Sequence, residues 1–294
     1  MLRILVLWFL LFAAPLRAEP LRVVADIAPV ASLVAMVLGD AGEVETLVQP
    51  GASPHDFSLR PSQARALSRA DGVIWIGPGL TPWMGRAIDN LAAGKPGLVL
   101  FDVAGTLHLE TREIAGDGHH GHEDHDHGDD DPHAWMDPRN AQIWLGAIAE
   151  ELGRLDPERA VQFAQRANAG VVSLEALEAE VRDGVHGARF AIYHDAIRYF
   201  EERFGVAARA VLSPSDASDP SARDVAGMRE LLEGGDVACI LADVTAKDRV
   251  LATVREGTGV KVVSVDPLGQ FVKPGPELYS EVVRSVGAVL SDCR

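Results

Sequence analysis

Short runs rich in valine and isoleucine alternate with longer helical patterns along most of the chain. The predicted strands of the first half are 21–26, 44–49, 72–77 and 97–102, and the helices between them include 30–40 and 61–70. The second half repeats the pattern, with strands at 188–194, 207–212, 236–243 and 260–266 and helices near 196–204, 221–233, 246–257 and 276–291. Strand, helix and strand repeated in this order predict a parallel sheet covered on both faces. We therefore expect an α/β protein with two doubly wound parallel-sheet lobes.

The middle of the chain predicts a helical connection between these lobes. Asp137-Pro138 combines an N-cap residue with a proline suited to the first helical turn, and opens a helix that runs through Arg154. Asp156-Pro157 then starts the longest helical pattern, which runs nearly to His186. We expect an N-terminal lobe at 19–154, a linking helix at 155–186 and a C-terminal lobe at 187–294.

The first 18 residues are typical of a secretory signal peptide. Arg3 gives a positive start, residues 4–14 form an apolar segment, and Ala18 is a small residue suited to cleavage. The apolar segment is too short for a spanning helix, so we expect an exported protein of about 276 residues, located in the periplasm. Loss of Arg3 and Arg17 takes the formal net charge from -16 to about -18. This acidity favours cations and gives no electrostatic reason to bind nucleic acid or anionic lipid.

Four potential metal ligands follow predicted strands. They are His55, His133, His194 and Asp266, two from each half of the chain. A lone histidine in a loop is more often solvated than bound to metal, but ligands of open α/β sheets bind beyond the carboxyl ends of the strands. These four side chains could therefore converge on a cleft between the lobes. Three imidazoles and one carboxylate suit tetrahedral Zn²⁺, whereas Mg²⁺, Ca²⁺ and Mn²⁺ favour more oxygen donors.

Four motifs in order resemble one family, the zinc-binding substrate-binding proteins of ABC transporters (cluster A-I, ZnuA-type). The motifs are PGASPHDFSLRPSQ, DPHAWMDP, YHDAIRYFEERFG and VDPLG. The resemblance implies two α/β lobes joined by one long helix, with the metal held between them by His55, His133 and His194. Manganese-binding relatives typically carry a carboxylate at the third of these positions, so His194 implies zinc.

The resemblance leaves the fourth ligand to be chosen. In some zinc-binding relatives it is a glutamate before the first histidine, or a water, but here that neighbour is Pro54, which has no donor side chain. Asp266 matches the aspartate that completes the site in other relatives, and we expect it to be the fourth ligand. Asp131, Asp137 and Asp195 flank the ligands and could orient imidazoles, although Asp137 more simply caps its helix. We expect Asp243 to line the cleft without binding metal.

The chain has two cysteines, Cys239 and Cys293. An oxidising compartment favours a disulfide between them, although the sequence alone also allows two free thiols. The resemblance implies the disulfide, because zinc-specific members of the family have one.

A histidine-rich, acidic stretch at 116–131 has no hydrophobic period and predicts a mobile loop. Its histidines are interleaved with Asp, Glu and Gly; they are His119, His120, His122, His125 and His127. We expect an auxiliary, low-affinity zinc collector beside the cleft. The alternative is a solvated acidic loop without a role.

These features predict a zinc carrier and not an enzyme. We expect a monomer that delivers Zn²⁺ to an ABC permease of the inner membrane with its ATPase; a zinc metallochaperone could load it. The alternatives are a secreted zinc-dependent hydrolase, with three histidines and a water on the metal, or a metal-binding adhesin. The chain lacks HExxH and GxSxG motifs, and four protein ligands would leave zinc no open position for a reacting water.

Overall fold

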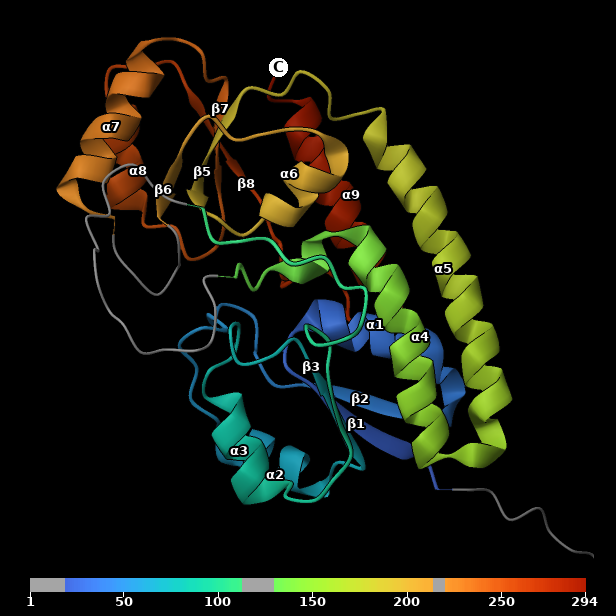
Figure 1. The fold of residues 1–294 in the computed structure, drawn as a ribbon. Helices are drawn as coiled ribbons and strands as arrows, with labels where there is room; N and C mark the ends of the chain where they lie inside the picture. Colours follow the sequence, from blue (N-terminus) through green and yellow to red (C-terminus); the bar gives the residue numbers. More distant parts are fainter. Residues whose placement is uncertain (1–18, 113–129, 214–219) are drawn as a thin grey trace, which may run out of the picture.

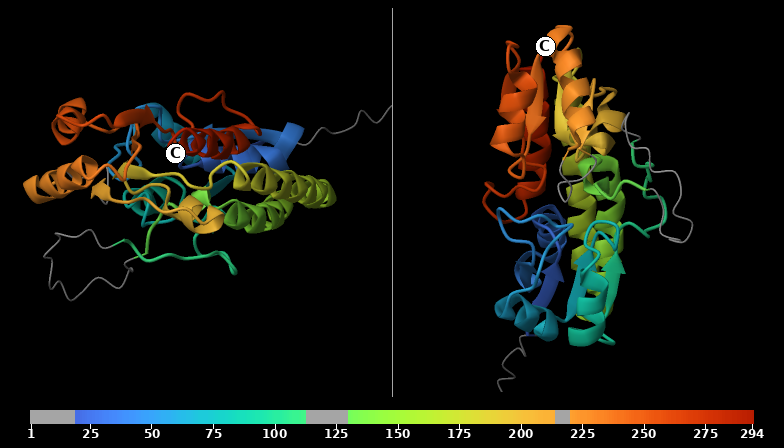
Figure 2. Two further views of the ribbon diagram at one scale, coloured as in Figure 1. Left: turned by 90° about the horizontal axis from the view of Figure 1, so that it is seen from above. Right: turned by 90° about the vertical axis from the view of Figure 1, so that its left-hand side faces the viewer.

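The computed structural model describes residues 19–112, 130–213 and 220–294. The expected signal peptide and the five histidines of the predicted loop therefore lie outside the described residues. Two lobes, each built on a parallel sheet, are joined by one long helix (Figure 1). The side view in Figure 2 shows the C-terminal lobe stacked on the N-terminal lobe. Among the described residues, no helix is long and apolar enough to cross a bilayer.

The N-terminal sheet has the strand order β2-β1-β3-β4, with all neighbours parallel. Its strands are β1 (Leu21–Ala25), β2 (Gly42–Thr46), β3 (Gly72–Trp75) and β4 (Gly97–Val99). Helix α1 (Ala28–Leu38) connects β1 to β2, α2 (Pro61–Arg69) connects β2 to β3, and α3 (Met84–Leu91) precedes β4. From β1 the chain goes first to β2 on one side of β1, and then to β3 on the other side. A topological switch point therefore lies between β1 and β3.

The C-terminal sheet repeats this topology in the order β6-β5-β7-β8, again all parallel. Its strands are β5 (Phe190–His194), β6 (Val211–Ser213), β7 (Cys239–Ala242) and β8 (Lys261–Ser264). Its helices are α6 (Arg198–Phe204), α7 (Ala222–Glu233), α8 (Asp248–Arg255) and α9 (Leu278–Ser291). The predicted fold class, with two doubly wound parallel-sheet lobes, is confirmed.

Most strands are shorter than the apolar runs that predicted them, and α3 was not among the expected helices. The strand predicted at 72–77 ends at Trp75, because the carboxylate of Asp26 accepts the amide hydrogen of Ile76 at 2.9 Å. Asp26 also accepts a hydrogen bond from Ile27, so this buried side chain bridges the ends of β1 and β3. Burial raises the pKa of Asp26 to about 7. The apolar residue Ile76 is buried, but a side chain takes the place of a strand partner there.

A helix of the N-terminal lobe, α4, leads into the one long helix that connects the lobes, α5. Helix α4 (Pro138–Leu155) is capped by Asp137, which accepts the amide hydrogen of Arg139 at 2.8 Å. A short 3₁₀ turn, η3 (Pro157–Arg159), leads into α5 (Ala160–Arg182), whose 23 residues run alongside both lobes in Figure 1. One hydrophobic cluster joins α1, α4, α5 and α9 with strands of both sheets. The two lobes therefore share a continuous core.

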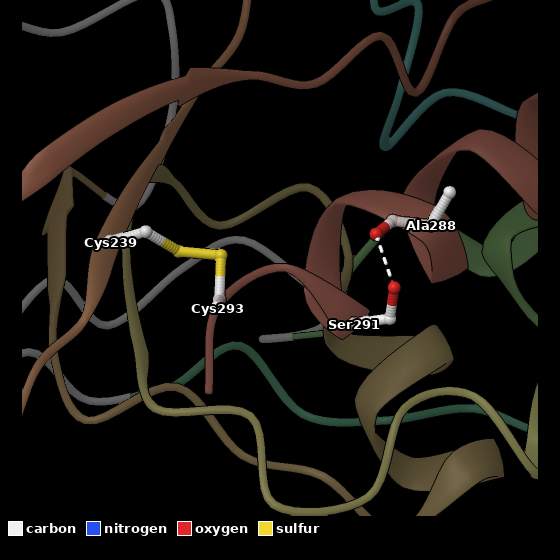
Figure 3. Close-up of a disulfide and its surroundings, with 4 residues drawn as sticks. All are labelled: Cys239, Ala288, Ser291 and Cys293. Carbon is white, nitrogen blue, oxygen red and sulfur yellow. Dashed lines mark hydrogen bonds between the residues drawn. A yellow bond between two sulfur atoms is a disulfide. The ribbon is translucent and has the colours of Figure 1, made fainter.

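The predicted disulfide between Cys239 and Cys293 is confirmed. Its Cα atoms lie 5.5 Å apart, and the bridge ties the start of β7 to the segment after α9 (Figure 3). The last turn of α9 is closed by Ser291, which donates to the carbonyl of Ala288 at 2.8 Å. The disulfide therefore joins residues that are 54 positions apart in sequence. It lies at the start of β7, and Asp243 follows the other end of that strand.

Candidate metal centre

Three histidines from three separate loops or strand ends meet between the lobes. His55 follows β2, His133 lies in the loop before α4, and His194 is the last residue of β5. One ring nitrogen of each lies within 4.8 Å of one from each of the others. The ring centroids are 5.0–6.0 Å apart with interplanar angles of 71–77°. The rings are therefore steeply inclined to one another around a common point and do not stack.

His55 is held by the loop that follows β2. The indole of Trp83 donates to the carbonyl of Pro54 at 2.9 Å, and the hydroxyl of Ser53 accepts the amide hydrogen of His55 at 3.1 Å. Burial, together with the neighbouring His133 and His194, lowers the pKa of His55 to about 3. Its imidazole therefore stays neutral well below the usual histidine pKa of ~6.5, with a lone pair available to a cation.

His133 is oriented by Asp131. Oδ1 of Asp131 lies 2.7 Å from Nδ1 of His133 and also accepts the backbone amide hydrogen of His133 at 2.9 Å. Both residues are buried. A carboxylate at Nδ1 fixes the imidazole with its proton on that nitrogen, which directs the lone pair of Nε2 to the centre.

His194 has a matching partner in Asp243. Oδ2 of Asp243 lies 2.9 Å from Nδ1 of His194, and Oδ1 accepts two hydrogen bonds from Thr245. Burial opposes ionisation of Asp243, but these hydrogen bonds outweigh it and lower its pKa below the usual value. Nε2 of His194 is buried and has no hydrogen-bond partner among the described residues. A buried nitrogen without a hydrogen-bond partner is available to bind a metal ion.

The spacing of the donors fits a zinc ion. Nε2 of His55 lies 3.4 Å from Nε2 of His133. Two nitrogens bound to one tetrahedral zinc at ~2.0–2.1 Å are about 3.3–3.4 Å apart. Two neutral imidazoles can share a hydrogen bond at this distance, but the convergence of a third nitrogen is explained better by a shared cation.

Asp266 lies beside this group but is not one of the donors within 4.8 Å of one another. It lines a cavity of about 20 Å³ together with His133, His194 and Asp243. This volume is about that of one water position, which suits a single ion and excludes an organic ligand. Oδ2 of Asp266 accepts the amide hydrogen of Phe271 at 3.0 Å. The carboxylate is therefore held at the wall of the cavity by its own turn.

The other flanking aspartates have different roles. Besides capping α4, Asp137 receives two hydrogen bonds from the guanidinium of Arg203, at 2.7 and 2.8 Å. Asp195 pairs with Arg112 at 3.2 Å. Sequence reasoning identified Asp131 as a possible orienting group but missed that role for Asp243, although its position after β7, next to β5, was a usable signal.

A family model described as "Zinc-uptake complex component A periplasmic" (ZnuA) matches residues 23–293. The high-affinity zinc uptake system protein ZnuA of Paracoccus denitrificans is 39% identical, over 96% of this chain and 94% of its own. The Brucella abortus protein of the same name is 32% identical, over 95% of this chain and 93% of its own.

A solved structure shares the fold. A crystal structure of ZnuA has a TM-score of 0.78 and 20% sequence identity, and the match covers 94% of this chain and 99% of that one. At this identity the match establishes the arrangement of the lobes and helices. The sequence relatives cover nearly the whole chain, and their names describe zinc uptake.

Proposed function

The chain belongs to the ZnuA family of periplasmic zinc-uptake components, and from this premise we propose that it binds one Zn²⁺ through His55, His133 and His194 and delivers it to an ABC permease. The observation that carries the proposal is the 3.4 Å separation of Nε2 of His55 and Nε2 of His133, with a nitrogen of His194 converging on the same point. Zinc is the cargo of the protein.

The donor set favours zinc over harder cations. Three imidazole nitrogens are good ligands for Zn²⁺, whereas Mg²⁺ and Ca²⁺ take mostly oxygen ligands. Asp131 and Asp243 support the same choice, because a carboxylate at Nδ1 makes the opposite nitrogen a stronger donor. The two carboxylates also offset part of the charge of a divalent ion in a buried site.

We propose Asp266 as the fourth ligand. It lines the same cavity as His133 and His194, which supports this assignment. Four protein ligands would leave the zinc no open position for an activated water, which supports a carrier and argues against a hydrolase. Zinc would leave this site when Asp266 withdraws, since the shared core of the lobes opposes a wide hinge motion.

The remaining parts of the chain fit export and capture. We propose that residues 1–18 direct export and are removed, and that the permease works with a cytoplasmic ATPase. His119, His120, His122, His125 and His127 would collect zinc near the cleft. The presence of five histidines within residues 119–127 supports this role, since neutral imidazoles are zinc ligands at neutral pH.

The test is zinc stoichiometry in a background where the five loop histidines are replaced by asparagine. We expect one tightly bound zinc, lost in each of the variants His55→Ala, His133→Ala and His194→Ala. His186→Ala, which changes an exposed histidine outside the site, is the matched control and should keep the zinc. Retention of the ion by the three variants would contradict the proposed site, and turnover of ester or peptide substrates would favour the hydrolase.

A further inference from the structure

The hydroxyl of Tyr199, in the C-terminal lobe, is hydrogen-bonded to both chain segments that border residues 113–129. The two segments, 107–112 and 130–133, pair through an isolated antiparallel bridge between Glu110 and Asp130. The amide of Asp131 donates to the carbonyl of Leu109 at 2.7 Å. We call these two segments the loop stems. The second stem ends at His133.

Tyr199, in the first turn of α6, contacts both stems, and its hydroxyl makes one hydrogen bond with each. It accepts the amide hydrogen of Leu109 at 3.0 Å and donates to the carbonyl of Asp131 at 2.8 Å. The side chain is fully buried, and burial raises its pKa, so the hydroxyl keeps its proton at neutral pH. One hydroxyl therefore satisfies a part-buried donor on one stem and a buried acceptor on the other.

These bonds fix the residue that orients His133. The backbone of Asp131 is held at its amide by Leu109 and at its carbonyl by Tyr199, and its carboxylate is bonded to the backbone and to Nδ1 of His133. Among the described residues, no other hydrogen bond links the backbone of Asp131 to the C-terminal lobe. The orientation of the His133 imidazole is thus linked, in two hydrogen-bonded steps, to α6.

Arg112 fastens the first stem to the same helix. Its guanidinium pairs with Glu201 of α6 at 2.8 Å and with Asp195 at 3.2 Å, and both carboxylates are buried. Asp195 directly follows His194. The stems are therefore attached to the C-terminal lobe close to two of the three histidines, one from each lobe.

We propose that Tyr199 is a positioning residue for zinc binding, which acts through Asp131 on the imidazole of His133. This inference rests on the proposed function of His133 as a zinc ligand. Tyr199 does not touch the ion; it holds the backbone of Asp131 in the place from which the carboxylate fixes the Nδ1 proton of His133. Loss of the hydroxyl leaves that backbone held only through its amide by Leu109, so zinc binding must order its carbonyl side again.

The test is a double-mutant cycle on zinc affinity, measured by competition with a chelator. Loss of an outer-sphere partner of a metal ligand typically costs about 10–100-fold in affinity, which we expect for Asp131→Ala. Tyr199→Phe keeps the ring and acts one step further away, so we expect a smaller loss, about three- to tenfold. In the Asp131→Ala background, Tyr199→Phe should cost nothing further, because the path to His133 is already broken.

The control is Tyr193→Phe. Tyr193 is another buried tyrosine, located on β5 beside His194 but packed in a separate core cluster, and this change should leave zinc affinity unchanged. An equal effect of Tyr199→Phe in both backgrounds, or no effect in either, would overturn the inference. Loss of zinc in His133→Ala together with wild-type affinity in Tyr199→Phe would overturn only the positioning role, whereas wild-type affinity in His133→Ala would remove the proposed site itself.

A second measurement uses the unmodified protein and needs no variant to fold. Coupling between two events is reciprocal, so a hydroxyl that strengthens zinc binding must itself be held more firmly when zinc is bound. The amide of Leu109 should therefore exchange its hydrogen about three- to tenfold more slowly in the zinc-loaded protein. Equal exchange rates with and without zinc would contradict the coupling.

Discussion

Asp243 and His194 are separated by 49 residues in the sequence, yet Oδ2 of Asp243 lies 2.9 Å from Nδ1 of His194. The pairing of β5 with β7 brings them together, because His194 ends one strand and Asp243 follows its neighbour. This contact fixes which nitrogen of His194 faces the other two imidazoles. It also gives the most direct way to test how far the surroundings of the ligands determine zinc binding.

Replacement of Asp243 by alanine should lower zinc affinity by about 10–100-fold, the usual cost of losing an outer-sphere carboxylate. The imidazole of His194 would lose its fixed orientation while the ligand itself remains. Chelator competition measures the change. Asp236→Ala removes an exposed carboxylate of the same lobe and should have no effect. Unchanged affinity in the Asp243 variant would show that His194 is oriented by packing alone.

Replacement of Asp266 by alanine should weaken zinc binding by more than the ~10–100-fold expected for an outer-sphere group, since a ligand is removed. X-ray absorption of the zinc-loaded protein should show one oxygen donor replaced or lost, with the three nitrogen donors retained. If the affinity and the donor set are both unchanged, the fourth ligand is a water and Asp266 only lines the cavity.

The depressed pKa of His55 predicts a pH dependence of the metal-free protein. Burial lowers this pKa to about 3, so between pH 3 and 6.5 the unfolded chain takes up a proton that the folded chain does not. This contribution to stability is therefore present above the unfolded pKa and is lost as the pH falls from about 6.5 towards 3. Compared with His55→Gln, the wild type should lose up to about 1.4 kcal/mol more per pH unit in this window.

Urea unfolding of both proteins at several pH values in the presence of a chelator measures this difference. The control is His186→Gln, because His186 is exposed and its replacement should leave the pH dependence as in the wild type. Parallel curves for the wild type and the His55 variant would contradict the low pKa.

The disulfide should contribute to stability without contributing to zinc binding. On the chain-entropy model, a bridge between residues 54 positions apart contributes about 4 kcal/mol. Cys239 starts β7, whereas Asp243 follows its other end, so the bridge is remote from the imidazoles. The double variant Cys239→Ala, Cys293→Ala should unfold at lower urea concentration and keep its zinc affinity. A large loss of affinity would mean that the bridge also sets the position of Asp243.

Much of this architecture could be predicted from local patterns. The apolar runs identified every strand, and Asp137-Pro138 marked the start of α4, since periodicity and capping depend on residues close together in sequence. The ends of the strands were predicted less well. β3 stops at Trp75 because Asp26, 50 residues earlier, supplies the acceptor for the next amide. No pattern within 72–77 contains that information.

The sequence by itself determined the order of strands and helices, the three candidate histidines and the two cysteines, because each is a residue type in a recognisable local setting. Only the tertiary structure decided that the three imidazoles meet, that Asp243 rather than a nearer carboxylate holds His194, and that Tyr199 is bonded to both loop stems. The physical reason is that hydrogen bonds act over about 3 Å in space. Which side chains come within that distance depends on how the two sheets pair and how the lobes pack.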